Sequence, residues 1–203
     1  MRRTKEDAAV TREHLLEAAL HIFHTKGYVG TTLDDIARAA GTTRGAIHWH
    51  FGSKAELYNT LIRESYQRAM PAYLEAFSTR GTPLQTLRRV MEFLIGYVED
   101  DTHFRTIMEI TLLRSEIQPE LAQGLQEKAE GNRIMQEQLE RLIKQGITLG
   151  EIRADVQSPV VALAIMSLTN GIVMQWLFAP DTFPLKAYGR EIVAYFLTGI
   201  AVP

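Results

Sequence analysis

Apolar residues recur along most of the chain at intervals of three and four, the spacing that places them on one face of an α-helix. The pattern predicts helices over 5–26, 32–40, 45–51 and 54–77, with glycines at 27 and 41 ending the first two. It predicts further helices over 83–98, 103–114, 119–146, 158–179 and 184–199. Since no useful stretch alternates with the period of a β-strand, we expect an all-α fold of about nine helices.

Polar residues at the predicted helix starts support these boundaries. Residues 32–35, 53–56 and 82–85 each have the spacing of a capping box, in which a Ser or Thr and an acidic or amide side chain three residues later satisfy free backbone N–H groups. Pro71 lies inside the long fourth helix, where it removes one backbone hydrogen bond and should kink or weaken the helix near Gln67. Because this helix joins the two parts of the chain, we expect it to be the hinge of a conformational change.

The stretch from Val156 to Pro180 contains no charged residue and is long enough to cross a membrane. Ser, Thr, Asn and Gln are scattered through it, and Asp155 and Asp181 flank it in place of positive charge. We therefore favour a helix that is buried on all sides over a membrane span. In a chain of this size, the second side would be covered by a partner subunit.

Composition is that of a globular protein, with 46% hydrophobic and 23% charged residues in 203. The absence of cysteine excludes a disulfide framework and thiolate metal sites, and it fits a reducing cytoplasm. The first six residues have no apolar stretch behind their charges, so we expect no signal peptide. Residues 1–54 carry a net charge of +2 and five of the six histidines, whereas the remainder carries −4. This asymmetry points to an anionic partner for the first part.

Residues 32–54 have the layout of a helix-turn-helix, with two short helices joined by Gly41, Thr42 and Thr43. If Ile47 of the second helix points inward, so does Phe51, while Gly45 and Trp49 point outward. A glycine there lets the backbone approach another surface closely. Such a helix fits the major groove of DNA, so the segment predicts a recognition helix.

At the N-terminus of that helix, Arg44 could contact a guanine edge through two hydrogen bonds. Thr42 and Thr43 offer hydroxyl and backbone N–H groups where a phosphate is favoured. Lys54 has the same position at the start of the following helix. A plain helical hairpin is the competing interpretation, but an exposed Trp49 between two histidines is unusual for an ordinary surface.

These residues resemble the DNA-binding domain of the TetR family of transcriptional repressors over about 50 residues. The multidrug-efflux branch, with its AcrR- and TtgR-like repressors, is the most similar, and the resemblance weakens beyond residue 60. The residues that carry it are Thr11-Arg12, Ala18-Ala19, Phe23, Gly27-Tyr28, Thr31-Thr32-Leu33, Ile36-Ala37, the run from Ala39 to Phe51, and Lys54-Ala55-Glu56-Leu57, with weaker matches at 107–110, Gly171 and 176–180.

The resemblance implies a helix-turn-helix domain over 1–54, an effector-binding and dimerisation domain over 55–203, and binding to double-stranded DNA. The residues it assigns to DNA, together with those chosen above, are Thr32, Thr42, Thr43, Arg44, Gly45, His48, Trp49, His50 and Lys54. Two positions depart from the family pattern, because residue 48 is usually Tyr and residue 42 is usually Val. Since a protonated His48 donates more strongly to phosphate, we expect operator affinity to rise at mildly acidic pH.

The resemblance also implies a homodimer that reads a palindromic operator, with helices 158–179 and 184–199 pairing with their counterparts. The middle helices would enclose a pocket for a hydrophobic small-molecule effector. The residues we expect to line it are Tyr66, Met70, Phe93, Tyr97, Phe104, Met108, Glu109, Leu112, Met135, Leu139, Met166, Asn170 and Met174. Residues of these types at helical spacing are also common in an ordinary core.

The resulting hypothesis is a cytoplasmic, ligand-responsive repressor of a multidrug efflux pump, without a cofactor or a metal. The main alternative is a regulator of the same family that senses a metabolite and controls a metabolic operon. The sequence does not decide whether the protein represses or activates transcription, or whether it binds DNA without responding to a ligand. An enzyme is disfavoured because no paired Glu-x-x-His motif, nucleophilic triad or phosphate-binding glycine loop occurs. No carboxylate or cysteine completes a metal site with the histidines at 21, 24, 48 and 50.

Overall fold

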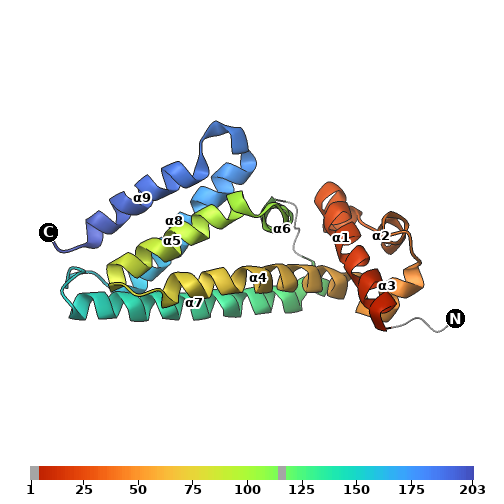
Figure 1. Ribbon diagram of the computed structural model, residues 1–203, viewed down its shortest axis with the longest axis horizontal. Helices are drawn as coiled ribbons and strands as arrows, with labels where there is room; N and C mark the ends of the chain where they lie inside the picture. The colour runs from red at the N-terminus through yellow and green to blue at the C-terminus, as the bar shows by residue number, and fades with distance from the viewer. Residues whose placement is uncertain (1–4, 114–117) are drawn as a thin grey trace. The chain divides into compact units, whose positions relative to one another are not determined.

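The computed structural model describes residues 5–113 and 118–203, and the all-α prediction is confirmed there (Figure 1). Within these residues there are nine α-helices and no β-strand, and one isolated bridge joins Ile152 to Ala201. Two short 3₁₀ turns, Pro119–Leu121 and Pro180–Thr182, precede α7 and α9. The α-helices are α1 (Lys5–Gly30), α2 (Leu33–Ala39), α3 (Arg44–Phe51), α4 (Lys54–Ser78), α5 (Pro83–Asp100), α6 (Thr102–Leu113), α7 (Ala122–Thr148), α8 (Ser158–Phe178) and α9 (Leu185–Ile200).

Two of the three predicted capping boxes form completely, those of Thr32 with Asp35 and Thr82 with Gln85. The third forms only in half. The Ser53 hydroxyl accepts from the Glu56 N–H at 3.1 Å, but the Ser53 N–H donates to the Phe51 carbonyl oxygen at 2.9 Å. The Glu56 carboxylate instead accepts from Arg63 at 3.0 Å, so the second half of the predicted box is wrong.

The described chain divides into two compact units that are not continuous in sequence. The first contains the residues up to Arg68 and those from His103 to Gly124, and the second contains 69–102 and 125–203. α4 passes from one unit to the other between Arg68 and Ala69, three residues before Pro71, and it stays one helix through the proline. The functional boundary at residue 54 stays a prediction.

The core of the first unit is built from α1, α2, α3, the start of α4 and α6. Phe23, Tyr28 and Tyr58 form an aromatic cluster with ring centroids 5.0–5.9 Å apart. The predicted helix end at Gly27 appears as a break inside α1, where φ is 69°. From α6, Ile107 and Ile110 are buried in the same core. α6 therefore belongs with the helices that precede α5, although it follows α5 in the chain.

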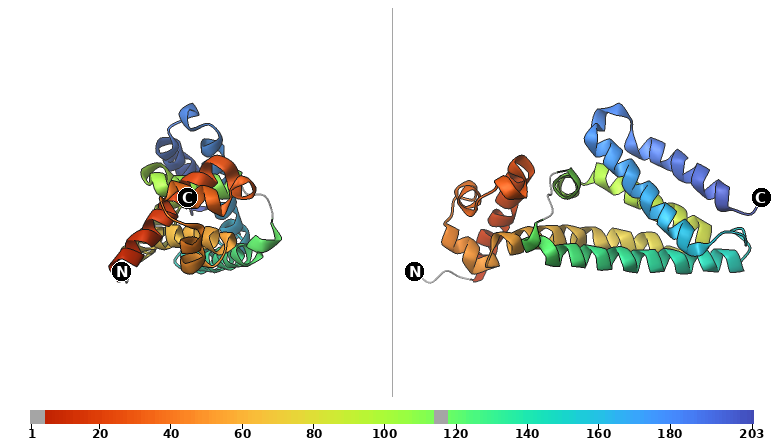
Figure 2. Two further views of the ribbon diagram at one scale, coloured as in Figure 1. Left: turned by 90° about the vertical axis from the view of Figure 1, so that its right-hand side faces the viewer. Right: turned by 180° about the vertical axis from the view of Figure 1, so that it is seen from behind.

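In the second unit, α5, α8 and α9 pack together (Figure 2). At Gly189 of α9 the backbone lies so close to α5 that an added Cβ would be 2.7 Å from Cγ2 of Ile95. Among the described helices, α8 is the one that is apolar enough and long enough to span a membrane. Half of its most apolar stretch is buried inside the protein. Its other side is exposed at Val160, Leu163 and Phe178, so this chain alone does not bury the helix on all sides.

Candidate functional site

The turn between α2 and α3 is fixed by the backbone itself. The N–H of Thr42 donates to the Ala37 carbonyl oxygen at 2.9 Å, and the N–H of Gly41 donates to that of Arg38 at 3.2 Å. This pair of bonds is a Schellman motif, which needs a left-handed residue, and Gly41 supplies it with a φ of 63°. The turn therefore holds the start of α3 in one place relative to α2.

α3 has the orientation that the sequence predicts. Thr43 caps it, with the hydroxyl accepting from the Ala46 N–H at 3.3 Å. Ile47 and Phe51 are buried in the core, whereas Trp49 is 73% exposed and Gly45 is exposed. The indole of Trp49 stacks edge-on against the ring of His50, with centroids 4.4 Å apart. One side of α3 thus anchors it, and the other presents a nearly bare backbone beside a large aromatic group.

Arg44 is exposed in the first turn of α3, where its Nη1 lies 3.9 Å from Oδ2 of Asp34 on α2. Asp34, in the first turn of α2, is not among the residues predicted from the sequence, because its proximity to Arg44 arises from the way the two helices pack. Thr32 is exposed too, but its hydroxyl donates to Asp35 at 2.7 Å and also accepts the Asp35 N–H. Thr42 is half-buried.

The ring of His48 has a defined tautomer. Its Nδ1 lies 2.8 Å from the carbonyl oxygen of Gly52, the residue that ends α3 with a φ of 78°. Because a carbonyl oxygen only accepts, Nδ1 must carry the proton. In the neutral ring Nε2 is then a hydrogen-bond acceptor, and it becomes a donor only on protonation.

Lys54 is more constrained than its place at a helix start suggests. Its ammonium donates to the carbonyl oxygens of Tyr28 at 3.0 Å and Thr31 at 3.1 Å, and it lies 4.2 Å from the centroid of the Tyr28 ring. These contacts connect α4 to the end of α1. An ammonium has three N–H groups, so one is left for another acceptor.

Four of the expected effector residues, Tyr66, Phe104, Met108 and Glu109, make contacts within the first unit. The ring of Tyr66 packs edge-on against that of Phe104 at 5.4 Å, and its hydroxyl donates to the sulfur of Met108 at 3.6 Å. Glu109 already has a protein partner, because its carboxylate lies 2.6 Å from Nε2 of His24 on α1. Leu112 is half-buried on the same helix.

The other expected effector residues lie in the second unit. Phe93 and Tyr97 of α5 have ring centroids 5.0 Å apart, and Phe93 also packs against Tyr73 of α4 at 6.1 Å. Tyr73 and its neighbour Phe77 were not selected, although both follow the apolar spacing of that helix. Burial raises the pKa of the Tyr73 hydroxyl to about 12.

The remaining expected effector residues differ in exposure. Leu139 is fully buried, Met135 and Met166 are half-buried, and Met70 is 45% exposed. Asn170 and Met174 are exposed on α8. These last two therefore lie on the uncovered side of that helix.

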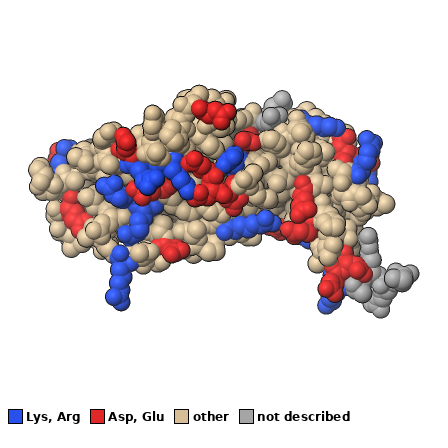
Figure 3. Space-filling model, turned by 45° about the horizontal axis from the view of Figure 1, so that its top comes forward, with Lys and Arg blue, Asp and Glu red and all other residues tan. Residues whose placement is uncertain are grey.

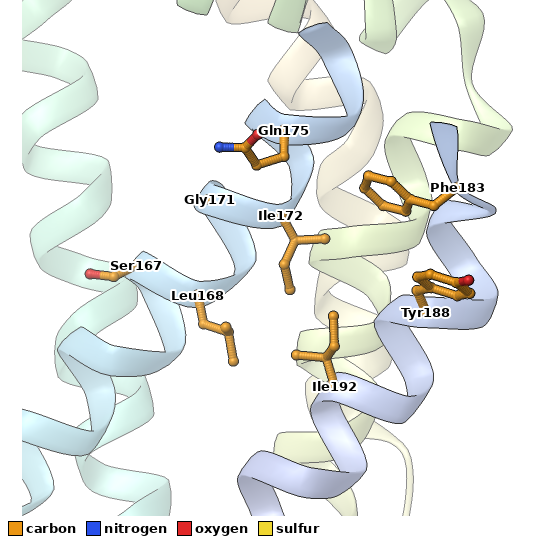
Figure 4. Close-up of a pocket in the computed structure, with 8 residues that line it drawn as sticks. All are labelled: Ser167, Leu168, Gly171, Ile172, Gln175, Phe183, Tyr188 and Ile192. Atoms are coloured by element: carbon orange, nitrogen blue, oxygen red, sulfur yellow. The ribbon is translucent and has the colours of Figure 1, made fainter. Parts of the chain in front are cut away.

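A shallow apolar groove of about 570 Å³ runs between α8 and α9. Ile172 of α8 and Ile192 of α9 point toward one another in it, while Ser167 and Gln175 point away from that side (Figure 4). Phe183 and Tyr188 stack at one end with centroids 5.7 Å apart. Gly171 lies in the groove wall, and a Cβ there would meet no atom within 4 Å.

Charge on the surface is mixed. On the face shown in Figure 3, lysine and arginine side chains are interspersed with aspartate and glutamate. Among the described residues, no group of three or more His, Asp or Glu is placed to hold a metal ion. The solvent-facing side of α3 and the α8–α9 groove are the exposed features that we consider for a function.

A helix-turn-helix whose second helix presents one exposed side is the layout of a DNA-binding domain. The family model of the bacterial regulatory proteins of the tetR family matches residues 15–61. The model for the C-terminal region of MAATS-type transcriptional repressors matches residues 82–201. The chain therefore belongs to the TetR family of transcriptional regulators.

Relatives match over nearly the whole chain. The transcriptional regulator AcrR of Shigella flexneri is 33% identical over 97% of this chain and 92% of its own length. The probable acrEF/envCD operon repressor of Escherichia coli K12 is 34% identical over 95% of this chain and 87% of its own length. The crystal structure of NalD, the secondary repressor of the MexAB-OprM multidrug efflux pump in Pseudomonas aeruginosa, is 27% identical with a TM-score of 0.85, covering 97% of this chain and 98% of that one.

Proposed function

We propose that this protein is a cytoplasmic repressor that binds a palindromic operator as a dimer, is released by a hydrophobic small molecule and controls a multidrug efflux pump. The observation that carries the proposal is the extent of the similarity. It covers the second unit as well as the helix-turn-helix, and it includes NalD, an efflux-pump repressor.

We assign the DNA contacts to the solvent-facing side of α3 and its two ends. We assign Arg44 a contact with a base edge, because it is exposed at the start of α3, and we expect exposed Gly45 to let the backbone come close to the groove floor. Thr43 lies where helix N–H groups attract phosphate. Thr32, Thr42, His48, Trp49, His50 and Lys54 complete the proposed interface. Thr32 and Lys54 already make hydrogen bonds within the protein, so we expect each to contribute less to DNA binding than the other residues.

We assign dimerisation to the groove between α8 and α9. Specific recognition by a helix-turn-helix normally uses two copies of the recognition helix about 34–36 Å apart. The exposed side of α8 and the groove beside it form an apolar surface, and its exposure to water is unfavourable. A second copy of the chain that contributes the same two helices would cover it.

We propose that the effector is bound by residues from the set of thirteen predicted from the sequence, and that the buried members of that set are stronger candidates than the exposed ones. Two separate clusters have side chains suited to an apolar ligand: the one around Tyr66, with an aromatic ring and a thioether in the first unit, and the aromatic one around Phe93 in the second. The carboxylate of Glu109 already lies 2.6 Å from Nε2 of His24, so it is a weaker candidate for binding a ligand. Asn170 and Met174 fit the dimer surface better than a pocket, because both are exposed.

The test is release of the protein from its operator, obtained from selected genomic fragments and labelled with a fluorophore. We expect apolar cations of several shapes to lower the anisotropy of the complex to that of free DNA. Release by only one acyl-CoA or hormone-like molecule would support the alternative, a metabolic regulator. If no compound releases an otherwise specific complex, ligand control is contradicted.

Replacing His48 by tyrosine should remove a pH dependence from operator binding. With Nδ1 bonded to the Gly52 carbonyl oxygen, the ring can donate from Nε2 to a phosphate only when it carries a second proton, and a lower pH favours that form. We expect the wild-type affinity to rise about tenfold from pH 8 to pH 6 relative to that of His48→Tyr. Equal pH profiles of the two proteins, measured by anisotropy, would rule out this role.

Replacing Pro71 by alanine should uncouple the effector from DNA. Pro71 is exposed and adjoins the point where α4 passes between the units, so alanine restores a backbone bond with little loss of packing. We expect operator affinity to stay within about threefold, while the effector concentration for half-release rises about fivefold or more.

The matched control for Pro71→Ala is Gly131→Ala, at an exposed glycine of α7 with no atom within 4 Å of the added Cβ. It stabilises a helix other than α4, by about 0.5–1 kcal/mol. Pro71→Ala should therefore shift half-release and Gly131→Ala should not. Unchanged operator affinity and unchanged release in Pro71→Ala would mean that the proline has no part in the coupling.

A further inference from the structure

Two neighbouring aspartates open α2, and their surroundings differ. Asp35 accepts hydrogen bonds from the backbone and hydroxyl of Thr32, and its other oxygen lies 2.8 Å from the ammonium of Lys26. Bonds from Lys26 and Thr32 hold the pKa of the Asp35 carboxyl well below its usual range. Asp35 is thus occupied in fixing the start of α2.

Asp34 has no part in that cap. Its side chain is 65% exposed, and its Oδ2 lies 3.9 Å from Nη1 of Arg44, which is 59% exposed. The pair crosses from α2 to the recognition helix, and the Schellman turn fixes the spacing of the two backbones. A negative charge therefore lies beside the arginine that we assign to the base edge.

A carboxylate on a surface that meets DNA opposes the phosphates. An exposed ion pair is weak, so Arg44 can leave Asp34 at little cost when a better partner is present. A guanine edge that takes two hydrogen bonds is such a partner, whereas one phosphate on unrelated DNA brings its own charge toward Asp34. The carboxylate therefore penalises the second kind of complex more than the first.

We propose that Asp34 is a specificity-determining residue that holds Arg44 away from phosphates on unrelated DNA and releases it on the operator. The inference rests on the proposed function and adds a residue outside the recognition helix to it. Discrimination comes in this case from weakening the wrong complex instead of strengthening the right one.

The test is Asp34→Asn, which keeps the shape of the side chain and removes its charge. Anisotropy with labelled operator and with a scrambled duplex, at about 50–200 mM salt, gives both affinities and their salt dependence. We expect affinity for the scrambled duplex to rise about three- to tenfold with a steeper salt slope, and affinity for the operator to rise less than about twofold. The ratio of the two affinities should fall accordingly.

The matched control is Asp155→Asn, which removes the same charge from another exposed pair, Asp155 with Arg153, in the second unit. It should leave the affinity ratio unchanged. The second control repeats Asp34→Asn in an Arg44→Ala background, where its effect on the scrambled duplex should shrink by at least about half.

Three results would overturn the inference: an equal rise in both affinities, no change in either, or the same effect with and without Arg44. Each of these can be observed only if the wild-type protein prefers the operator to the scrambled duplex. A wild-type protein without that preference would contradict the proposed function itself.

Discussion

Replacing Arg44 by alanine is expected to abolish preferential binding to the operator. A two-bond contact to guanine discriminates against the wrong base by about 1–3 kcal/mol. Because a dimer uses two copies, the expected loss is about 2–6 kcal/mol, or at least about 30-fold in operator affinity. Binding to a scrambled duplex should weaken much less, because there Arg44 has no matching guanine edge to contact and Asp34 holds it away from the phosphates.

The fold should survive this change, because the Arg44 side chain is exposed and its ion pair with Asp34 lies on the surface. We expect unfolding free energy to change by no more than about 0.5 kcal/mol, measured by thermal denaturation. Arg153→Ala, at an exposed arginine of the second unit, is the matched control and should bind the operator normally. If operator and scrambled affinities fall by the same factor in Arg44→Ala, the arginine contacts phosphate only.

Replacing Gly171 by glutamate should separate the dimer while leaving the subunit folded. In the single chain the added side chain meets open space, and glutamate favours a helix over glycine by roughly 0.5–1 kcal/mol. Covered by a second copy, the same side chain would bury an unpaired charge in each subunit, at a cost of about 3–5 kcal/mol or more. We expect the dimer dissociation constant to rise at least about 100-fold.

The readouts are sedimentation equilibrium for the dimer and anisotropy for the operator, whose affinity should fall by a similar factor because a monomer reads one half-site. Gly131→Glu is the matched control, since Gly131 is also an exposed, mid-helix glycine with open space around it. It should dimerise and bind normally. A Gly171→Glu protein that sediments as an intact dimer would remove the α8–α9 groove from the interface.

Local signals in the sequence were sufficient for most of the fold. The capping residues Thr32 and Thr82 and the glycines at 27 and 41 each act within a few residues, so their effects could be predicted without knowing the tertiary structure. The orientation of α3 followed from the helical period, because Ile47 and Phe51 are one turn apart and both face the core.

Contacts between distant parts of the chain could not be predicted in this way. The pairing of Glu109 with His24 joins residues 85 positions apart, and the Asp34–Arg44 pair depends on how the turn places two helices. α8 is apolar on every side, so its periodicity does not tell which residues face a partner. The sequence therefore could not show that Asn170 and Met174 lie on the exposed side of the helix.

The most direct measurement is selection and sequencing of genomic fragments that bind the purified protein at about 150 mM salt, where non-specific phosphate binding is weakened. We predict enrichment of one palindrome, with half-sites about one helical turn apart, upstream of an efflux-pump gene. Enrichment upstream of a metabolic operon would contradict the assignment to a pump and favour a metabolite sensor. No enriched sequence would contradict the repressor function.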